Sequence, residues 1–280
     1  MKKTFLIALA ATALAAPAFA DHHSMSKAEH DKMHKAHTDR LAKILADPSR
    51  GADAKRDQYR HPAETFEFFR LHPDHVIGEY APGGEWVSRI LGRYVNEKGK
   101  YTGLYFGTKS HFSDQQKTGI AAGIAKFPAD VAAVSGRPAT DFNAFSLSEI
   151  PDGAKGSFDR IIVMRMMHNM MNWNIADAEI KAMRDLLKDD GLLGIEQHRA
   201  KADAPFSYTN GTKGYMREAD IIKFMEVNGF ELVAKSEINA NPKDSANWPD
   251  GVWTLPPALR LKDVDRAKYE AIGETDRMTL

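Results

Sequence analysis

The segment EYAPGGEW, residues 79–86, has the residue types of a turn that binds a nucleotide. Glu79 ends an apolar run, and a helical pattern begins at Trp86. Small residues that would let a ligand approach the backbone stand between them, namely Ala81, Pro82, Gly83 and Gly84. Ala81 and Glu85 occupy positions where glycines are expected, and Glu85 would either crowd a ligand or cap the first turn of the helix. The segment therefore predicts a binding site with an altered glycine pattern.

Histidines near the N-terminus predict a metal site. After cleavage at Ala20 the chain would start Asp21-His22-His23, where a free amine, two deprotonated amides and an imidazole could surround Cu(II) or Ni(II) in a square plane. A second group falls on one face if its segment is helical: His30, Met33, His34 and His37. The candidate ligands are His22, His23, His30 and His34. The alternative is a polar arm whose histidines only interact with solvent.

Residues 1–20 have the pattern of a secretory signal peptide. A basic start, a short apolar core and an Ala-x-Ala ending predict cleavage after Ala20 and a periplasmic or secreted protein. No other segment approaches the roughly 20 apolar residues that a membrane helix needs, so we expect no integral membrane span. The cleaved chain is slightly negative, which gives no case for nucleic-acid binding. The chain has no cysteine, which excludes disulfides and thiolate sites.

Apolar runs of strand length alternate with helical patterns between residues 59 and 238, which is typical of βαβ units and a mostly parallel sheet. We expect strands at 75–80, 101–106, 130–134 or 139–145, 159–165, 191–197, 230–237 and 276–280. We expect helices at 63–69, 85–94, 115–125, 176–187 and 218–228. Residues 21–58 are predicted to be a mobile arm with a short helix over 41–45, and residues 239–272 a long loop before the last strand.

Several longer segments resemble the class I S-adenosylmethionine-dependent methyltransferases, and among them an exported bacterial family of predicted methyltransferases of undefined substrate. The segments are MRMMHNMMNW, LLGIEQHRA, GYMREADIIKFMEVNGFELVAKSEINANPKD, VWTLPP and IGETDRMTL, with EYAPGGEW at the head of the element order. The resemblance implies an α/β fold with a Rossmann-like, doubly wound, mostly parallel seven-stranded sheet and an antiparallel C-terminal edge strand. It implies that residues 59–280 form a methyltransferase-like domain.

The same resemblance implies S-adenosylmethionine as cofactor. Glu79 would orient the methionine amino group, and the turn at 81–84 would pass close to the cofactor. Tyr105 stands where the family has an acidic residue for the ribose hydroxyls, so hydrogen bonds on the order of 1 to 3 kcal/mol are lost there. Ser146, after the third strand, is a candidate contact to the adenine edge.

Candidate acceptor-site residues follow the fourth and fifth strands. His168 could deprotonate an oxygen or nitrogen acceptor near neutral pH, or it is a hydrogen-bonded loop histidine. Asn169 beside it either orients the acceptor or caps a helix. His198 and Tyr215 are candidate walls of the acceptor pocket and could equally be ordinary loop residues. The methionines within 164–171 favour a soft core or an adaptable pocket wall.

Two functions follow from these features. The leading one is S-adenosylmethionine-dependent methyl transfer to a small-molecule acceptor by an exported enzyme. The alternative is a catalytically inactive protein of the same fold that binds a periplasmic ligand or copper or nickel.

Overall fold

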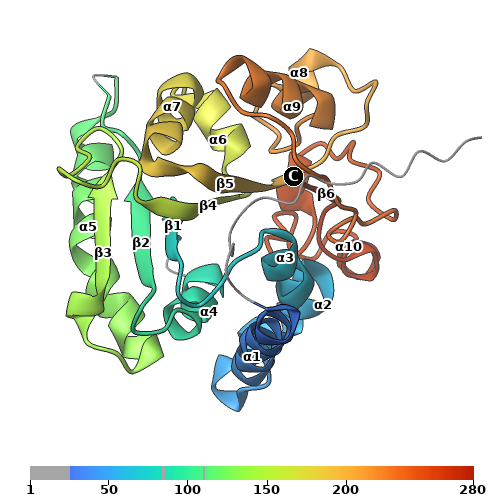
Figure 1. Cartoon of the computed structure of the whole chain (residues 1–280). Helices are drawn as coiled ribbons and strands as arrows, with labels where there is room; N and C mark the ends of the chain where they lie inside the picture. Colours follow the sequence, from blue (N-terminus) through green and yellow to red (C-terminus); the bar gives the residue numbers. More distant parts are fainter. Residues whose placement is uncertain (1–25, 84–85, 110) are drawn as a thin grey trace, which may run out of the picture.

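The computed structural model describes residues 26–83, 86–109 and 111–280. Within these residues a six-stranded sheet has the order β3-β2-β1-β4-β5-β6, parallel except for the antiparallel β6 (Figure 1). The strands are β1 (Val76–Tyr80), β2 (Lys100–Tyr105), β3 (Phe142–Ser146), β4 (Phe158–Met164), β5 (Leu187–His198) and β6 (Arg277–Thr279). The predicted α/β Rossmann-like class and the antiparallel C-terminal edge strand are confirmed, and of the two ranges offered for the third strand the second is the one that forms.

Helices cover both faces of this sheet (Figure 1). One face carries α1 (Lys27–Leu45), α3 (Pro62–Phe68), α4 (Trp86–Tyr94) and α5 (Asp114–Ser135). The other carries α6 (Met167–Asn172), α7 (Ala176–Leu186) and α9 (Glu218–Val227). The shorter helices are α2 (Asp57–Arg60), α8 (Phe206–Thr209), α10 (Arg266–Ile272) and the 3-10 turns η1 (Pro48–Arg56), η2 (Ala139–Asp141) and η3 (Gly251–Thr254). No helix in the described part of the chain is both long and apolar enough to cross a membrane.

The central strand β4 shows how the sequence fills both faces. Ile161 and Val163 pack into the core under α7, whereas Ile162 and Met164 pack into the core under α4. This two-residue alternation is the period of a strand, and both sets are apolar because both faces are covered. Met167 and Met170, at the start of the methionine-rich helix α6, are completely buried and belong to the first core.

The predicted seventh strand, 230–237, does not form. Ser236 and Thr279 make one isolated antiparallel bridge, and the described residues on either side of Ser236 in this segment have no strand pairing. Leu232 and Val233 are 41% and 42% exposed, so the segment lacks the burial that a strand inside a sheet gains. β6 spans 3 residues and pairs with β5, which leaves a short edge for any further strand. The prediction of seven strands was therefore wrong, because a strand-like composition needs an edge with which to pair.

Helix α1 is much longer than the helix predicted over 41–45. A capping box between Ser26 and Glu29 begins it, and it runs 19 residues to Leu45. Leu41 is buried, and the Arg40 guanidinium donates to the backbone oxygens of 93–95 at 2.6 to 3.1 Å. Those oxygens lie at the end of α4, where a helix leaves carbonyl groups unpaired. The part of the expected mobile arm that the structure describes is therefore a helix packed on the domain.

The polypeptide between β5 and β6 folds around one buried carboxylate. Asp244 is completely buried, and its Oδ2 accepts hydrogen bonds from the Tyr215 hydroxyl and the Asp276 amide, both at 2.8 Å. Its Oδ1 accepts from the Ala246 amide and the Trp248 indole, also at 2.8 Å. This arrangement holds residues 244–276 against the end of β5.

Candidate functional site

A cleft of about 520 Å³ opens at the carboxyl ends of β1 and β4. Six segments line it: the turn after β1, the loop and helix after β4, the end of β5, the 3-10 turn η3 with the residues that follow it, the residues before β6, and the arginines before and within α2. In an open parallel sheet this end of the strands, at the point where strand order reverses, is where ligands bind. β1 lies at that point, between β2 and β4.

Six of the candidate residues lie together in the lining of this cleft: Glu79, Ala81, Gly83, His168, Asn169 and His198. Pro82 packs instead on β2, since a methyl group added at Gly103 would meet its Cγ at 3.1 Å. Tyr105 packs on the Phe127 ring of α5, and the Ser146 hydroxyl donates to the Phe106 oxygen. Tyr215 is completely buried behind His198, with 6.3 Å between ring centroids. Gly84, Glu85, His22 and His23 lie outside the described residues.

The Glu79 carboxylate is buried beneath the cleft and already has partners. It accepts a hydrogen bond from the Ser88 hydroxyl of α4 at 2.9 Å and another from the Tyr101 hydroxyl of β2. Burial raises the pKa of Glu79, and the hydrogen bonds from Tyr101 and Ser88 oppose that shift. Glu79 therefore joins β1 to α4 and β2 as well as lining the cleft.

Two residues with side chains adopt a left-handed backbone on the cleft wall. Ala81 has φ +51° in the turn after β1, and Arg165 has φ +58° directly after β4. This conformation costs a residue other than glycine about 1–2 kcal/mol. Such backbone strain persists where the surrounding structure stabilises the conformation, and strained residues are found most often at functional sites. The first expected glycine position of EYAPGGEW therefore keeps the glycine conformation although it carries a methyl group.

Arginines give the cleft a positive side. Arg56, Arg60 and Arg165 line it together with Glu274, which pairs with Arg60, and the buried Glu196 pairs with Arg165. Arg60 Nε lies 2.8 Å from Glu274, and its guanidinium lies over the Trp86 ring, 5.2 Å from the centroid. Burial and the nearby Arg165 lower the pKa of Arg60 to about 9, which leaves it charged at neutral pH.

Two neutral histidines, His168 and His198, form a further wall of the cleft. The His168 and His198 rings lie 5.7 Å apart, and Trp253 lies 6.1 Å from His168. Burial lowers the pKa of His168 to about 4, although a hydrogen bond with Gln197 opposes the shift. Burial and the neighbouring His168 lower the pKa of His198 well below its usual value, and its Nδ1 lies 2.6 Å from the Thr275 hydroxyl. Both rings are therefore uncharged at pH 7.

Of the four predicted N-terminal metal ligands, His30 and His34 fall within the described residues and His22 and His23 do not. His30 and His34 lie on α1, as a helical segment requires, and the side chain of His30 lies outside the described residues. His34 Nε2 lies 3.6 Å from the exposed carboxylate of Glu67. The copper or nickel site therefore stays a prediction.

Comparisons with solved structures identify the fold. The [4+2]-cyclase SpnF is 14% identical over 90% of this chain and 93% of its own, with a TM-score of 0.51. The chain shares its fold with this cyclase. Two other matches are a SAM-dependent methyltransferase from Aquifex aeolicus (15% identity, 71% of this chain and 93% of that one, TM-score 0.47) and the glycopeptide N-methyltransferase MtfA complexed with S-adenosylmethionine (12%, 62% and 79%, 0.42).

No protein-family model matches the sequence, and no curated protein sequence matches it. Because SpnF is only 14% identical to this chain, its likeness establishes the fold and leaves the reaction to be argued from the site.

Neutral His168 makes folding sensitive to acid. The unfolded chain takes up a proton on this ring near pH 6.5, whereas the folded chain does so only near pH 4. Stability is therefore lost as the pH falls through this window, by on the order of 3 kcal/mol at about 1.4 kcal/mol per pH unit. We expect His168→Asn to lose correspondingly less stability between pH 7 and pH 4, as measured by urea unfolding at each pH. Asn169→Ala should keep the wild-type dependence, and parallel curves for His168→Asn and wild type would contradict the assignment.

Sequence reasoning missed the arginines and the closing segment of the cleft. One sequence feature could have placed Arg165 at the cleft, since this residue directly follows a buried strand in the loop that carries His168. No sequence feature places Arg60 there, because its partner Glu274 is 214 positions away. Trp253, Pro256 and Pro257 were assigned to a long loop, and the structure places them on the cleft.

Proposed function

We propose that the cleft binds S-adenosylmethionine and that the protein transfers its methyl group to a small-molecule acceptor. The observation that carries this proposal is the position of the turn after β1: Ala81 and Gly83 form the wall of a cleft at the strand-order reversal of an open parallel sheet. A volume of about 520 Å³ is in the usual range for small-molecule sites. We also propose that residues 1–20 direct export of the chain.

The charges of the cleft suit the methionine end of this cofactor. Its carboxylate would lie against the side that carries Arg56, Arg60 and Arg165, because guanidinium groups pair with carboxylates in a bidentate way. Its amino group would lie toward Glu79, near the end of β1 and before the turn at 81–84. The sulfonium would face the histidine wall, whose uncharged rings do not repel it.

The chemistry asks little of the protein beyond positioning. When bound, the cofactor supplies an activated methyl group, and the acceptor's lone pair displaces the thioether. Holding the acceptor in line supplies most of the rate. His168 and His198 are in the form that accepts a proton, and the low pKa of His168 makes it a weak base. We therefore propose that His168 and Asn169 hold the acceptor, and that His168 takes its proton only when the acceptor becomes acidic on methylation.

Two observations favour a second candidate, a catalytically inactive ligand-binding protein on the same fold. The Glu79 carboxylate is already occupied by Ser88 and Tyr101, and Tyr105, at the ribose position of the resemblance, packs against α5. Either feature weakens cofactor binding without changing the fold. In this candidate the cleft, or the N-terminal histidines through copper or nickel, would bind the ligand.

Calorimetric titration of residues 21–280 with S-adenosylmethionine and S-adenosylhomocysteine tests the proposal. Wild type should bind both, and Gly83→Val should bind at least about tenfold more weakly because its side chain enters the cleft. Gly119→Val is the matched control, since Gly119 is exposed on α5 and an added Cβ would meet nothing within 4 Å.

The outcomes separate the two candidates. Binding that Gly83→Val loses and Gly119→Val keeps supports a cofactor site and leads to a screen of acceptors. Binding without methyl transfer to any acceptor class supports the inactive ligand-binding protein. Absence of binding by wild type at millimolar ligand would overturn the proposal.

A further inference from the structure

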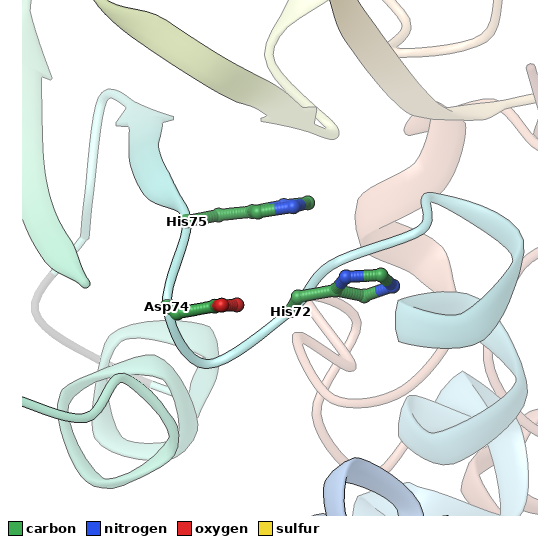
Figure 2. Close-up of side chains that lie close together, drawn as sticks. All are labelled: His72, Asp74 and His75. Atoms are coloured by element: carbon green, nitrogen blue, oxygen red, sulfur yellow. The ribbon is translucent and has the colours of Figure 1, made fainter. Parts of the chain in front are cut away.

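Three metal-ligating side chains gather on the loop between α3 and β1. His72, Asp74 and His75 each offer one ligand atom, and these atoms all lie within 4.8 Å of one another. Figure 2 shows the three side chains extending to the same side of the loop. Because the loop precedes the first residue of β1, the cluster lies at the amino ends of the strands, at the edge of the sheet opposite to the cleft.

Helix α1 brings a further imidazole to this loop. The His37 ring lies 4.7 Å from the His72 ring, and the His72 ring stacks on that of His75 at 4.5 Å between centroids. His37, His72 and His75 are half-buried, and Asp74 is exposed. Two segments separated by more than 30 positions thus contribute to one row of imidazoles beside a carboxylate.

The donor set selects a class of ion. Imidazole nitrogens with one carboxylate oxygen suit Zn(II), Co(II), Ni(II) and Cu(II), whereas Mg²⁺ and Ca²⁺ take oxygen ligands. Ligand atoms about 2.1 Å from a tetrahedral ion lie about 3.4 Å apart, so separations of up to 4.8 Å need to close by up to about 1.4 Å. Rotation of the exposed Asp74 and of the half-buried rings supplies a movement of that size.

We propose that His72, Asp74 and His75 bind a divalent transition-metal ion, with His37 as the fourth ligand. Zn(II) fits the tetrahedral arrangement of three imidazoles and a carboxylate. The ion links α1 to the loop before β1, so its role is to fix the N-terminal helix on the domain. This site is separate from the copper or nickel site predicted from His22 and His23, and it does not depend on the proposed methyl transfer.

Titration with Co(II), followed by its visible absorption and by competition with Zn(II), tests the site in metal-free residues 21–280. Wild type should bind one Co(II) per chain in a four-coordinate spectrum. The His72→Asn/His75→Asn variant should bind at least about 100-fold more weakly, since removing ligands exceeds the 10- to 100-fold effect of changing their supporting groups. Asp74→Asn, at an exposed position, provides a second variant that does not disturb folding. The control His22→Asn/His23→Asn should keep the wild-type spectrum.

The alternative is that the imidazoles only pack α1 onto the domain. An affinity of His72→Asn/His75→Asn within about threefold of wild type, with unchanged unfolding in the presence of a chelator, would overturn the site. Loss of Co(II) binding in His22→Asn/His23→Asn would assign the ion to the N-terminus instead. Zn(II) should protect α1 from hydrogen exchange in wild type and not in His37→Asn, and equal protection in both would exclude His37 as a ligand.

Discussion

Asp244→Ala is expected to lower the free energy of unfolding by about 3–5 kcal/mol. The substitution removes a completely buried carboxylate that accepts hydrogen bonds from Tyr215, Ala246, Trp248 and Asp276. Hydrogen bonds to a charged group contribute about 1.5–3 kcal/mol each, and the four are not additive. Urea unfolding followed by circular dichroism measures the loss. The same variant should lose ligand binding in the cleft, because the segment that Asp244 holds carries Trp253 and Thr275.

Asp263→Ala is the matched control for this prediction. Asp263 is exposed in the same segment, and an exposed substitution of this kind changes stability by about 0.5 kcal/mol or less. A loss below about 1 kcal/mol in Asp244→Ala would show that the segment between β5 and β6 is held by other contacts.

Glu196→Ala is expected to cost a similar amount, about 3–5 kcal/mol, for a different reason. Glu196 is completely buried on β5, with Arg277 Nε at 2.9 Å and Arg165 Nη1 at 3.1 Å. Removing Glu196 leaves the buried Arg277, whose Nη1 also lies 2.7 Å from Glu274, and Arg165 with less charge compensation, and this is the source of the cost. Arg277 is 1% exposed and cannot reach water without local unfolding. Thermal and urea unfolding at pH 7 measure the change.

Glu196→Gln separates charge from hydrogen bonding in this network. Burial alone would raise the pKa of Glu196, but Arg277, Arg165 and Arg60 outweigh it and lower the pKa. The folded pKa thus lies below the unfolded one, so this carboxylate stabilises the protein above about pH 4.5, and the contribution is lost as the pH falls. Glu196→Gln should lower the free energy of unfolding by most of the contribution of this carboxylate at pH 7, and by less at pH 4. Equal losses at both pH values would mean that the charge contributes little.

Much of the fold follows from local patterns. The runs that became β1, β2 and β4 are buried at most positions, and Asn228-Gly229 marks the end of α9, where Gly229 has φ +86°. The strand expected at 230–237 failed because pairing depends on the length of β6, a distant element. Ala81, Gly83 and His168 could be placed on the cleft because they follow strands that the pattern located. Arg60 and Trp253 could not be placed on the cleft. The position of Arg60 depends on a long-range ion pair, and Trp253 lies in a loop whose sequence has no hydrophobic periodicity.

The distance in sequence between Arg60 and Glu274 also has a consequence for the order of folding. Arg60 and Glu274, which pair at the cleft, are 214 positions apart, so this ion pair cannot form until both residues have been synthesised. Closing so long a loop has a large entropic cost that is paid before the contact forms, which places this contact late in folding. A chain emerging from its N-terminus can therefore form β1 to β4 early, while the cleft takes shape only when the segment carrying Glu274 and Arg277 docks. We therefore expect the cleft to be the last region to acquire its structure.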